Sequence, residues 1–222
     1  RIAYYDASNS DLKYASKSGG VWTTEIVDAP GSVGQFASLA LDAAGNPRIS
    51  YQDAGASALK YASKSGGIWT AETADATGIV GQYTSLALDA AGNPRISYYD
   101  GTNQDLKYAT RTAGIWTSET VDAVGNVGQH TSLALDVAGN PHISYYDNTN
   151  ADLKVAKCVN AACTGAATIT TVDSAGSVGF YTSMAIGTDG LPVISYLHAT
   201  VTNATVRAAK CANAACTGSA TT

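Results

Sequence analysis

The feature that most constrains the fold of this chain is an internal repeat of 47 residues. The segment Gly-Asn-Pro-Arg-Ile-Ser contains Pro47 and returns at Pro94, a close variant returns at Pro141, and a fourth copy follows 51 residues later at Pro192. A fixed period of about 20 to 50 residues is the signature of propellers, solenoids and other repeat folds. The sequence therefore predicts a single domain over 1–222, divided into repeats 1–47, 48–94, 95–141, 142–192 and a partial repeat 193–222.

Each repeat contains four short strand candidates separated by turn signals. In one set the candidates are 84–89, 95–99, 106–110 and 115–121, and Gly, Asn and Pro occupy the intervening turn 90–94. Four antiparallel strands make one blade of a β-propeller. Counting along the chain gives four strands of the first kind, five of the second, five of the third and four of the fourth. We therefore predict an all-β, five-bladed propeller with incomplete terminal repeats, either closed by strands from both ends or part of a longer ring.

The order of strands within a blade follows from residue size. The first strand carries small residues at its centre, as a crowded strand near the axis requires: Ala40, Ala87, Ala134 and Ala185. Alternation predicts that the leucines of these strands are buried, namely Leu39, Leu41, Leu86, Leu88, Leu133 and Leu135. The three tryptophans then lie on outer strands, where we expect them to pack between neighbouring blades: Trp22, Trp69 and Trp116.

Charge and hydropathy exclude several classes of partner. There are 13 basic and 18 acidic residues and no Lys/Arg cluster, which disfavours nucleic acid and anionic membranes. No apolar run approaches the ~18 residues of a spanning helix. The sequence starts at Arg1 with neither Met nor a signal peptide, as a mature or trimmed form would.

Four cysteines form two C-x4-C pairs, Cys158/Cys163 and Cys211/Cys216, inside near-identical segments. A zinc site needs about four ligands, and neither pair has a His or carboxylate close by. We therefore predict two local disulfides, which indicate an oxidising compartment and a secreted or cell-surface protein.

The hairpin 86–100, Leu-Ala-Leu-Asp-Ala-Ala-Gly-Asn-Pro-Arg-Ile-Ser-Tyr-Tyr-Asp, resembles the repeats of bacterial extracellular β-propellers, including NHL-type hairpins with a D-x-x-G-N turn. The 47-residue period is also similar to that of tachylectin-type sugar-binding propellers, a resemblance that implies one ligand site per blade. The chain lacks the Trp-rich and Phe-rich motifs of that lectin, so no binding residue is carried over. It also lacks the S-x-D-x-G-x-x-W box of sialidase-like propellers.

Catalytic patterns are absent from the sequence. There is no G-x-S-x-G, H-E-x-x-H, P-loop or G-x-G-x-x-G motif, and the acidic residues repeat symmetrically instead of forming one pair suited to glycoside cleavage. His130, His142 and His198 occupy different repeat positions, which disfavours a shared metal site. Arg1, Arg48 and Arg95 share a position beside the Gly-Asn-Pro turn, where we expect solvated strand ends.

Repeated polar segments on one face are the candidate ligand site. A V-G-Q-aromatic segment precedes each first strand, and a Tyr-Asp turn with a following Asn connects the second and third strands on the same face. An aromatic plane, an amide and a carboxylate suit a sugar ring with hydroxyls. The predicted ligand-binding residues are Gln35, Phe36, Gln82, Tyr83, Gln129, His130 and Tyr181 from the first segment, and Tyr5, Asp6, Tyr99, Asp100, Asn103, Tyr146, Asp147 and Asn150 from the turns; Asn9 is the turn Asn of the first repeat.

Other interpretations of these residues remain open. Asp and Asn can instead close turns through side-chain to backbone hydrogen bonds. Calcium is a further candidate, because Asp100, Asn103 and Asp105 cluster oxygen atoms, although their spacing differs from that of an EF-hand loop; no other cofactor is expected. The leading functional hypothesis is lectin-like carbohydrate binding or adhesion without catalysis. A protein-interaction or structural scaffold is the alternative, followed by a glycoside hydrolase or lyase.

Overall fold

The computed structural model describes residues 1–217, and every regular element in this range is a β-strand. The eighteen strands are β1 (Ile2–Asp6), β2 (Asp11–Ser18), β3 (Val21–Asp28), β4 (Val33–Leu41), β5 (Pro47–Asp53), β6 (Ala58–Ser65), β7 (Ile68–Asp75), β8 (Val80–Leu88), β9 (Pro94–Asp100), β10 (Asp105–Thr112), β11 (Ile115–Asp122), β12 (Val127–Leu135), β13 (Pro141–Asp147), β14 (Asp152–Lys157), β15 (Thr168–Asp173), β16 (Ser177–Ile186), β17 (Pro192–Ala199) and β18 (Ala204–Lys210).

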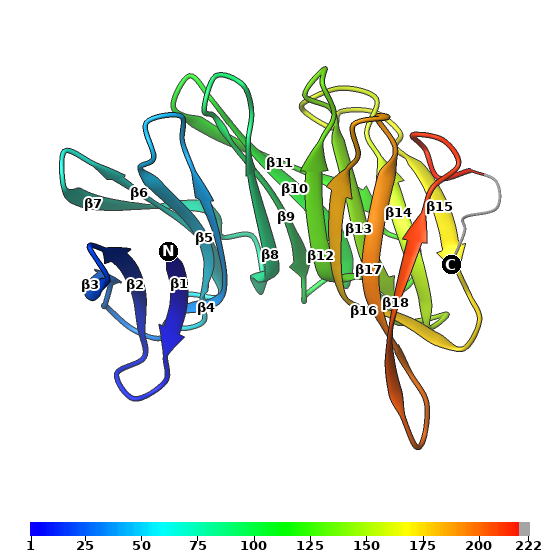
Figure 1. The fold of residues 1–222 in the computed structure, drawn as a ribbon, viewed down its shortest axis with the longest axis horizontal. Coiled ribbons are helices and arrows are strands. Elements are labelled where there is room, and N and C mark those ends of the chain that lie inside the picture. The colour runs from blue at the N-terminus through cyan, green and yellow to red at the C-terminus, as the bar shows by residue number, and fades with distance from the viewer. Residues whose placement is uncertain (218–222) are drawn as a thin grey trace.

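These strands form five antiparallel sheets that follow one another like propeller blades (Figure 1). The first sheet is β1–β3, the second β4–β7, the third β8–β11, the fourth β12–β15 and the fifth β16–β18, and within each sheet the strands are neighbours in chain order. The predicted number of strands of each kind is confirmed. The repeats, counted from the Gly-Asn-Pro turn, start at the second strand of a sheet, so their boundaries fall inside the sheets.

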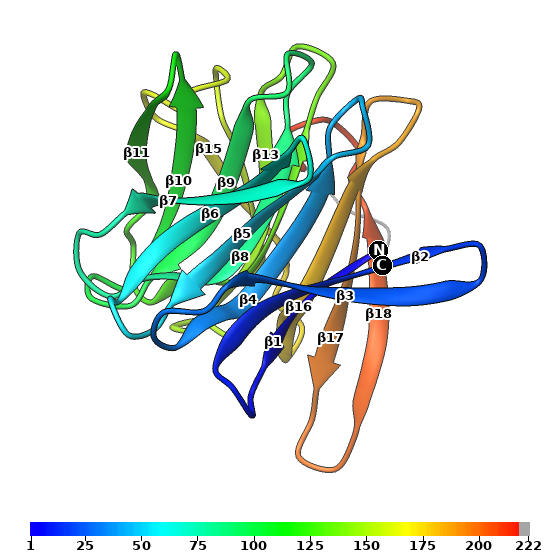
Figure 2. The ribbon, with the colours of Figure 1, turned by 90° about the vertical axis from the view of Figure 1, so that its left-hand side faces the viewer.

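The first and last sheets each have three strands. β1 and β18 belong to different sheets, and no strand pairing joins these two sheets within residues 1–217. The expectation that strands from both ends complete one blade is therefore wrong for the described residues, and the last five positions of the partial repeat 193–222 lie outside them. Figure 2 gives the same series of sheets seen from the side of the first sheet. No helix in the described range is long and apolar enough to span a membrane.

The hydrophobic core lies between successive sheets. Four clusters of buried side chains each draw on two neighbouring sheets, and buried isoleucines of the second strands contribute to all four, namely Ile49, Ile96, Ile143 and Ile194. The first strands β4, β8, β12 and β16 contact one another in sequence, as the predicted innermost strands should.

Only part of the leucine prediction is correct. Leu86 and Leu133 are buried, and Leu39, Leu88 and Leu135 are half-buried. Leu41 is 46% exposed. The first sheet begins with a strand of the second kind, so no innermost strand from a preceding sheet lies beside Leu41 to cover it.

A buried polar network joins each sheet to the next. At the junction of the second and third sheets, the Tyr98 hydroxyl donates to Asp75 Oδ2 at 2.6 Å, and Lys107 Nζ lies 2.7 Å from the same oxygen. The equivalent carboxylates Asp28, Asp122 and Asp173 also receive a Tyr hydroxyl and a cationic side chain. A buried charge is tolerable only when it is paired and hydrogen-bonded, so this network fixes how neighbouring sheets meet.

The outer strands show how the tryptophans and disulfides are used. Trp69 packs edge-on against Tyr14 of the preceding sheet, and Trp116 packs in the same way against Tyr61, with ring centroids 5.4 and 5.5 Å apart. Packing between blades is thus confirmed for these two. It is wrong for Trp22, which is 49% exposed because residues 1–217 form no earlier sheet beside its own.

In the fourth sheet, a disulfide loop contacts the preceding sheet where Trp69 and Trp116 do so in the second and third sheets. Tyr108 donates to the carbonyl of Ala161, which lies inside the loop closed by Cys158 and Cys163. The loop closed by Cys211 and Cys216 similarly receives Thr170, through the carbonyl of Ala215. Both predicted disulfides are present, and each secures a loop between two sheets.

Candidate functional site

The V-G-Q-aromatic motif lies inside the innermost strand of its sheet and not, as expected, in the loop before it. The pairing of β8 with β9 shifts register between Gln82 and Ser85, so this half of the strand bulges. Both Gly81 and Tyr83 have positive φ, 88° and 53°. A bulge re-aims a side chain, and here it turns the aromatic residue out of the regular alternation of the strand.

The glycine of the motif is required by the neighbouring sheet. A Cβ at Gly128 would lie 2.6 Å from Leu106 Cα in the preceding sheet, and its φ is +101°. Gly34, Gly81 and Gly179 meet equivalent leucines at 2.7–2.9 Å. Because only glycine allows such close approach at this backbone angle, the motif can bulge while the strand remains packed.

The four bulged aromatic side chains form a continuous stack, which we name the aromatic row: Phe36, Tyr83, His130 and Tyr181. Successive ring centroids are 4.7, 4.4 and 4.4 Å apart, and the rings are tilted by 52–56°. Each ring comes from a different innermost strand, β4, β8, β12 or β16. The structure thus brings together the aromatic residues that the sequence places 47 or more positions apart.

Hydrogen bonds between innermost strands hold the row in register. Thr131 Oγ1 donates to the carbonyl of Tyr83 at 3.0 Å and pairs with Ser97 Oγ at 2.7 Å. Thr84 and Thr182 repeat both contacts one sheet before and one sheet after. The aromatic row is therefore preorganised, because its backbone is bonded on both sides independently of any ligand.

The row lines an open groove of about 290 Å³, together with the residue that follows each ring. Tyr181 is 71% exposed and Phe36 is 39% exposed, whereas Tyr83 and His130 are half-buried. Burial lowers the pKa of His130 and raises that of Tyr83. At neutral pH the row thus presents uncharged, partly apolar rings.

A second layer of aromatic rings supports the row. Tyr99 lies 6.2 Å from Tyr83 and Tyr146 lies 6.4 Å from His130, and both supporting tyrosines are buried. Phe180, which replaces the glutamine of the fourth motif, stacks on Tyr146 at 4.1 Å. Tyr99 and Tyr146, predicted from the Tyr-Asp turn, are therefore close to the row but beneath it.

The predicted glutamines are half-buried beside the row. Gln129 Nε2 donates to Asn126 Oδ1 at 3.3 Å, and the same oxygen receives the Tyr99 hydroxyl at 3.0 Å. Gln35 and Gln82 occupy the equivalent positions on β4 and β8. These amides are the polar groups nearest in sequence to the rings, and Asn126 is a polar neighbour that the motif did not predict.

The turn carboxylates are engaged within their own turns. Asp100 is 1% exposed and accepts from the backbone N–H of Thr102 and Asn103 and from the Asn103 side chain, at 2.9–3.1 Å. Asp147 and Asn150 repeat this arrangement. These contacts are those of the turn-closing interpretation, and they leave Asn103 and Asn150 exposed with their amide nitrogens bonded.

The remaining predicted residues, Tyr5 and Asp6, belong to the first sheet, which contributes no ring to the row in residues 1–217. Asp6 receives Asn9 Nδ2 at 2.8 Å and pairs with Lys13 Nζ at 2.5 Å, and these hydrogen bonds hold the pKa of Asp6 at about 2. Tyr5 is half-buried with its hydroxyl 3.4 Å from Ser32 Oγ.

The oxygen cluster considered for calcium is also part of this turn. Burial and the nearby Asp100 raise the pKa of Asp105, while Asp100 itself is held by turn N–H groups. Among the described residues, no group of three or more His, Cys, Asp or Glu side chains is arranged to hold a metal ion.

The comparisons with known proteins support the fold. No family model matches the chain, and no curated protein matches it significantly. One similar solved structure is a protein of unknown function from Dyadobacter fermentans, with a TM-score of 0.63 and 13% identity over 93% of this chain and 69% of the other. Another is the SapL1 lectin in complex with α-methyl fucoside, with a TM-score of 0.59 and 14% identity over 91% of this chain and 73% of the lectin. An exo-β-1,3-galactanase from Phanerochaete chrysosporium is also similar, with a TM-score of 0.54 and 11% identity over 85% of this chain and 49% of the enzyme. The chain therefore spans about half of that enzyme's length. These structural neighbours include a lectin and a glycosidase, and the resemblance to NHL and tachylectin repeats gains no support from sequence.

Proposed function

We propose that this chain is a carbohydrate-binding module of a β-propeller protein and that its aromatic row binds a neutral or weakly polar saccharide. The observation that carries the proposal is the row itself, in which one preorganised ring per innermost strand borders an open groove. A sugar ring has an apolar face that packs on an aromatic plane and hydroxyls that bond to amides. Gln82 and Gln129 would supply those amides.

Binding without catalysis is the form of the proposal that these contacts favour. The carboxylates Asp100 and Asp147 on the same face are buried and bonded by their turns, so they are poorly placed to deliver a proton to a glycosidic oxygen. The lectin neighbour is consistent with binding, while the galactanase shows that related folds carry enzymes.

The repeat gives the proposed site a use on multivalent surfaces. Each pair of neighbouring rings would bind a sugar weakly, and several such sites on one rigid domain raise avidity by about 10² to 10⁴. Adhesion to a glycan-coated surface suits such a site. The two disulfides favour a secreted or cell-surface location for it.

A glycan array followed by calorimetry tests the proposal. The best array ligand should bind at least tenfold more weakly to a Tyr83→Ala, His130→Ala double variant and to Tyr181→Ala, whose exposed ring can be removed without opening the core. Trp22→Ala is the matched control, because it removes an exposed aromatic ring from the outermost strand of the first sheet, which contributes no ring to the row.

Two outcomes would contradict it. Unchanged affinity in both row variants would place the ligand elsewhere on the chain and refute the row as its site. Absence of binding to any glycan would favour the protein-interaction scaffold.

A further inference from the structure

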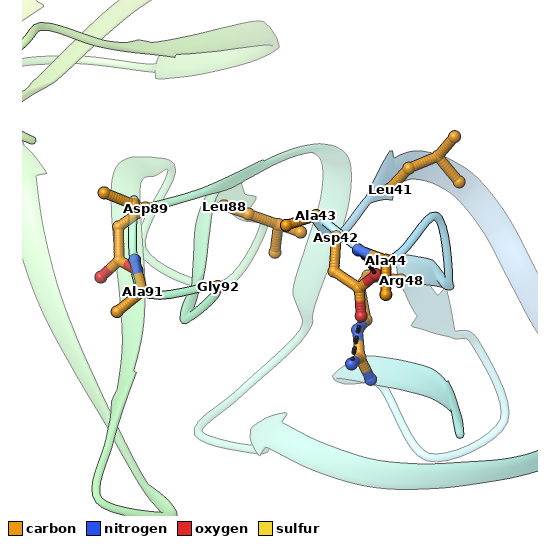
Figure 3. A pocket seen from close by; sticks show the side chains of 10 residues that line it. Leu41, Asp42, Ala43, Ala44, Arg48, Leu88, Asp89, Ala91 and Gly92 are labelled. Atoms are coloured by element: carbon orange, nitrogen blue, oxygen red, sulfur yellow. Dashed lines mark hydrogen bonds and ion pairs between the residues drawn. The ribbon is translucent and has the colours of Figure 1, made fainter. Parts of the chain in front are cut away.

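A second type of cavity occurs at the opposite ends of the innermost strands. It lies between the turn that joins β4 to β5 and the turn that joins β8 to β9, and has a volume of about 450 Å³. Asp42, Ala44 and Arg48 border it from one turn, and Leu88, Asp89 and Ala91 from the next (Figure 3). The volume falls within the roughly 300 to 1,000 Å³ of small-molecule sites.

The same cavity returns one sheet later. It is bordered by Asp89, Ala91 and Arg95 on one side and by Val137 and Ala138 on the other, with a volume of about 260 Å³. Val137 stands at the repeat position of Ala90, and Ala161 of the disulfide loop also borders the second cavity. Val137 itself is fully exposed, so the added loop is the feature that accompanies the smaller volume.

The polar wall of each cavity is built by its turn. Asp42 accepts from the backbone N–H of Ala44 and Asn46, from the Asn46 side chain and, at 2.8 Å, from the Arg48 guanidinium. These bonds hold the pKa of Asp42 at about 2, so the pair stays ionised. The expectation that Arg48 and Arg95 are solvated strand ends is wrong, because each is folded against the Asp six residues before it.

The arginines keep donors that the protein does not use. Nε of Arg48 and Nε of Arg95 are buried without a hydrogen-bond partner, and Arg95 is only 8% exposed. Among the described residues, Arg48 gives one side-chain hydrogen bond, through Nη2, so its Nη1 has no protein acceptor in residues 1–217. Arg48 Nη1, which unlike Nε is not enclosed by protein atoms, is the donor that a ligand oxygen in the cavity can reach.

We propose that these two cavities bind a small neutral polyhydroxyl ligand, a single sugar unit, at a site distinct from the aromatic row. The guanidinium donates to a ring or hydroxyl oxygen, and Leu88 with the turn alanines packs on the C–H face; Asp42, which already accepts four hydrogen bonds, fixes the guanidinium in place. An acidic sugar is disfavoured, because Asp42 already neutralises Arg48 and Asp89 faces them across the cavity.

An NMR titration of the ¹⁵N-labelled chain with methyl α-glucoside and methyl α-fucoside tests this proposal, with glucuronate as the acidic comparison. The neutral glycosides should shift the amide signals of Ala44, Ala91 and Gly92. Ala91→Leu fills the first cavity from an exposed position without touching the Asp42–Arg48 pair, and should weaken binding there at least tenfold. Ala90→Val, which copies Val137, should weaken it less.

The results of this titration can be distinguished from the results expected for ligand binding at the aromatic row. The Tyr83→Ala, His130→Ala variant should leave the turn shifts unchanged, and Ala138→Leu, the matched change in the second cavity, should leave the first cavity active. Shifts confined to the aromatic row, equal shifts in Ala91→Leu, a larger response to glucuronate, or no shifts at any concentration reached would each overturn the second site.

Discussion

Removal of the Tyr98 hydroxyl should loosen the junction between the second and third sheets. This hydroxyl donates to Asp75 Oδ2 at 2.6 Å, both side chains are buried, and Lys107 shares the acceptor. A hydrogen bond to a charged group contributes about 1.5–3 kcal/mol, and no water can replace it in a fully buried position. Tyr98→Phe should therefore lower the free energy of unfolding by that amount, or the melting temperature by roughly 3–12 °C for a domain of this size.

The chain contains its own control. Tyr4 occupies the same repeat position in the first sheet, where no sheet formed by residues 1–217 supplies a carboxylate to it, and it is half-buried. Tyr4→Phe should change stability by less than about 0.5 kcal/mol. Urea denaturation followed by tryptophan fluorescence measures both variants. Equal losses in the two, or a loss below about 0.5 kcal/mol in Tyr98→Phe, would refute the role assigned to the network.

Four further predictions concern the same junctions and the row. Ser97→Ala breaks a buried hydrogen bond to the next sheet and should cost about 1 kcal/mol in denaturant unfolding, whereas Ser195→Ala, at the same repeat position on the exposed last sheet, should cost almost nothing. Gly128→Ala combines a backbone clash with a positive φ and should lower the free energy of unfolding by roughly 2–4 kcal/mol. The control Gly114→Ala, which has a positive φ but open space around its Cβ, should lower it by about 1–2 kcal/mol. Intact mass should show four hydrogens fewer than the reduced chain, and reduction should cost at most roughly 2–3 kcal/mol per bridge; four free thiols would contradict it. The lowered pKa of His130 means that the unfolded chain takes up a proton more readily than the folded chain, so stability should be full above pH ~6.5 and fall as the pH drops through the folded value. Burial lowers the pKa of His142 in the same direction, so His130→Phe, which copies Phe36, should reduce the fall in melting temperature over this range without abolishing it.

The strand pattern could be predicted because its signals are local. Gly, Asn and Pro mark each turn at a fixed spacing, and the small central residues of the first strand, such as Ala87, identify the strand nearest the axis. The period then extends one correct assignment to every sheet. Leu41 shows the limit of that extension, because its exposure depends on a neighbouring strand that the first sheet does not have.

The roles of the polar residues could not be predicted in the same way. Asp75 meets a tyrosine 23 positions later and a lysine 32 positions later, and no local pattern indicates either contact. The recurrence of all three residues at one period was the only available signal. The sequence does not show whether the carboxylate of Asp100 faces solvent, where it could bind a ligand, or its own turn N–H groups, which it does in the structure.

The first sheet helps to distinguish residues that recur for contacts between sheets from residues that recur on the surface. Tyr4, Lys13 and Trp22 repeat residue types that elsewhere bond or pack against a preceding sheet, and here they have none to meet. A residue that recurs with its contact, as the buried tyrosine, aspartate and lysine do, is explained by the junction between sheets. The aromatic row behaves differently, since its backbone recurs while its ring changes from Phe to Tyr to His to Tyr. A contact between sheets needs one particular hydrogen bond and therefore one residue type. A surface that packs on a ligand needs only a flat ring, and every residue of the aromatic row supplies one.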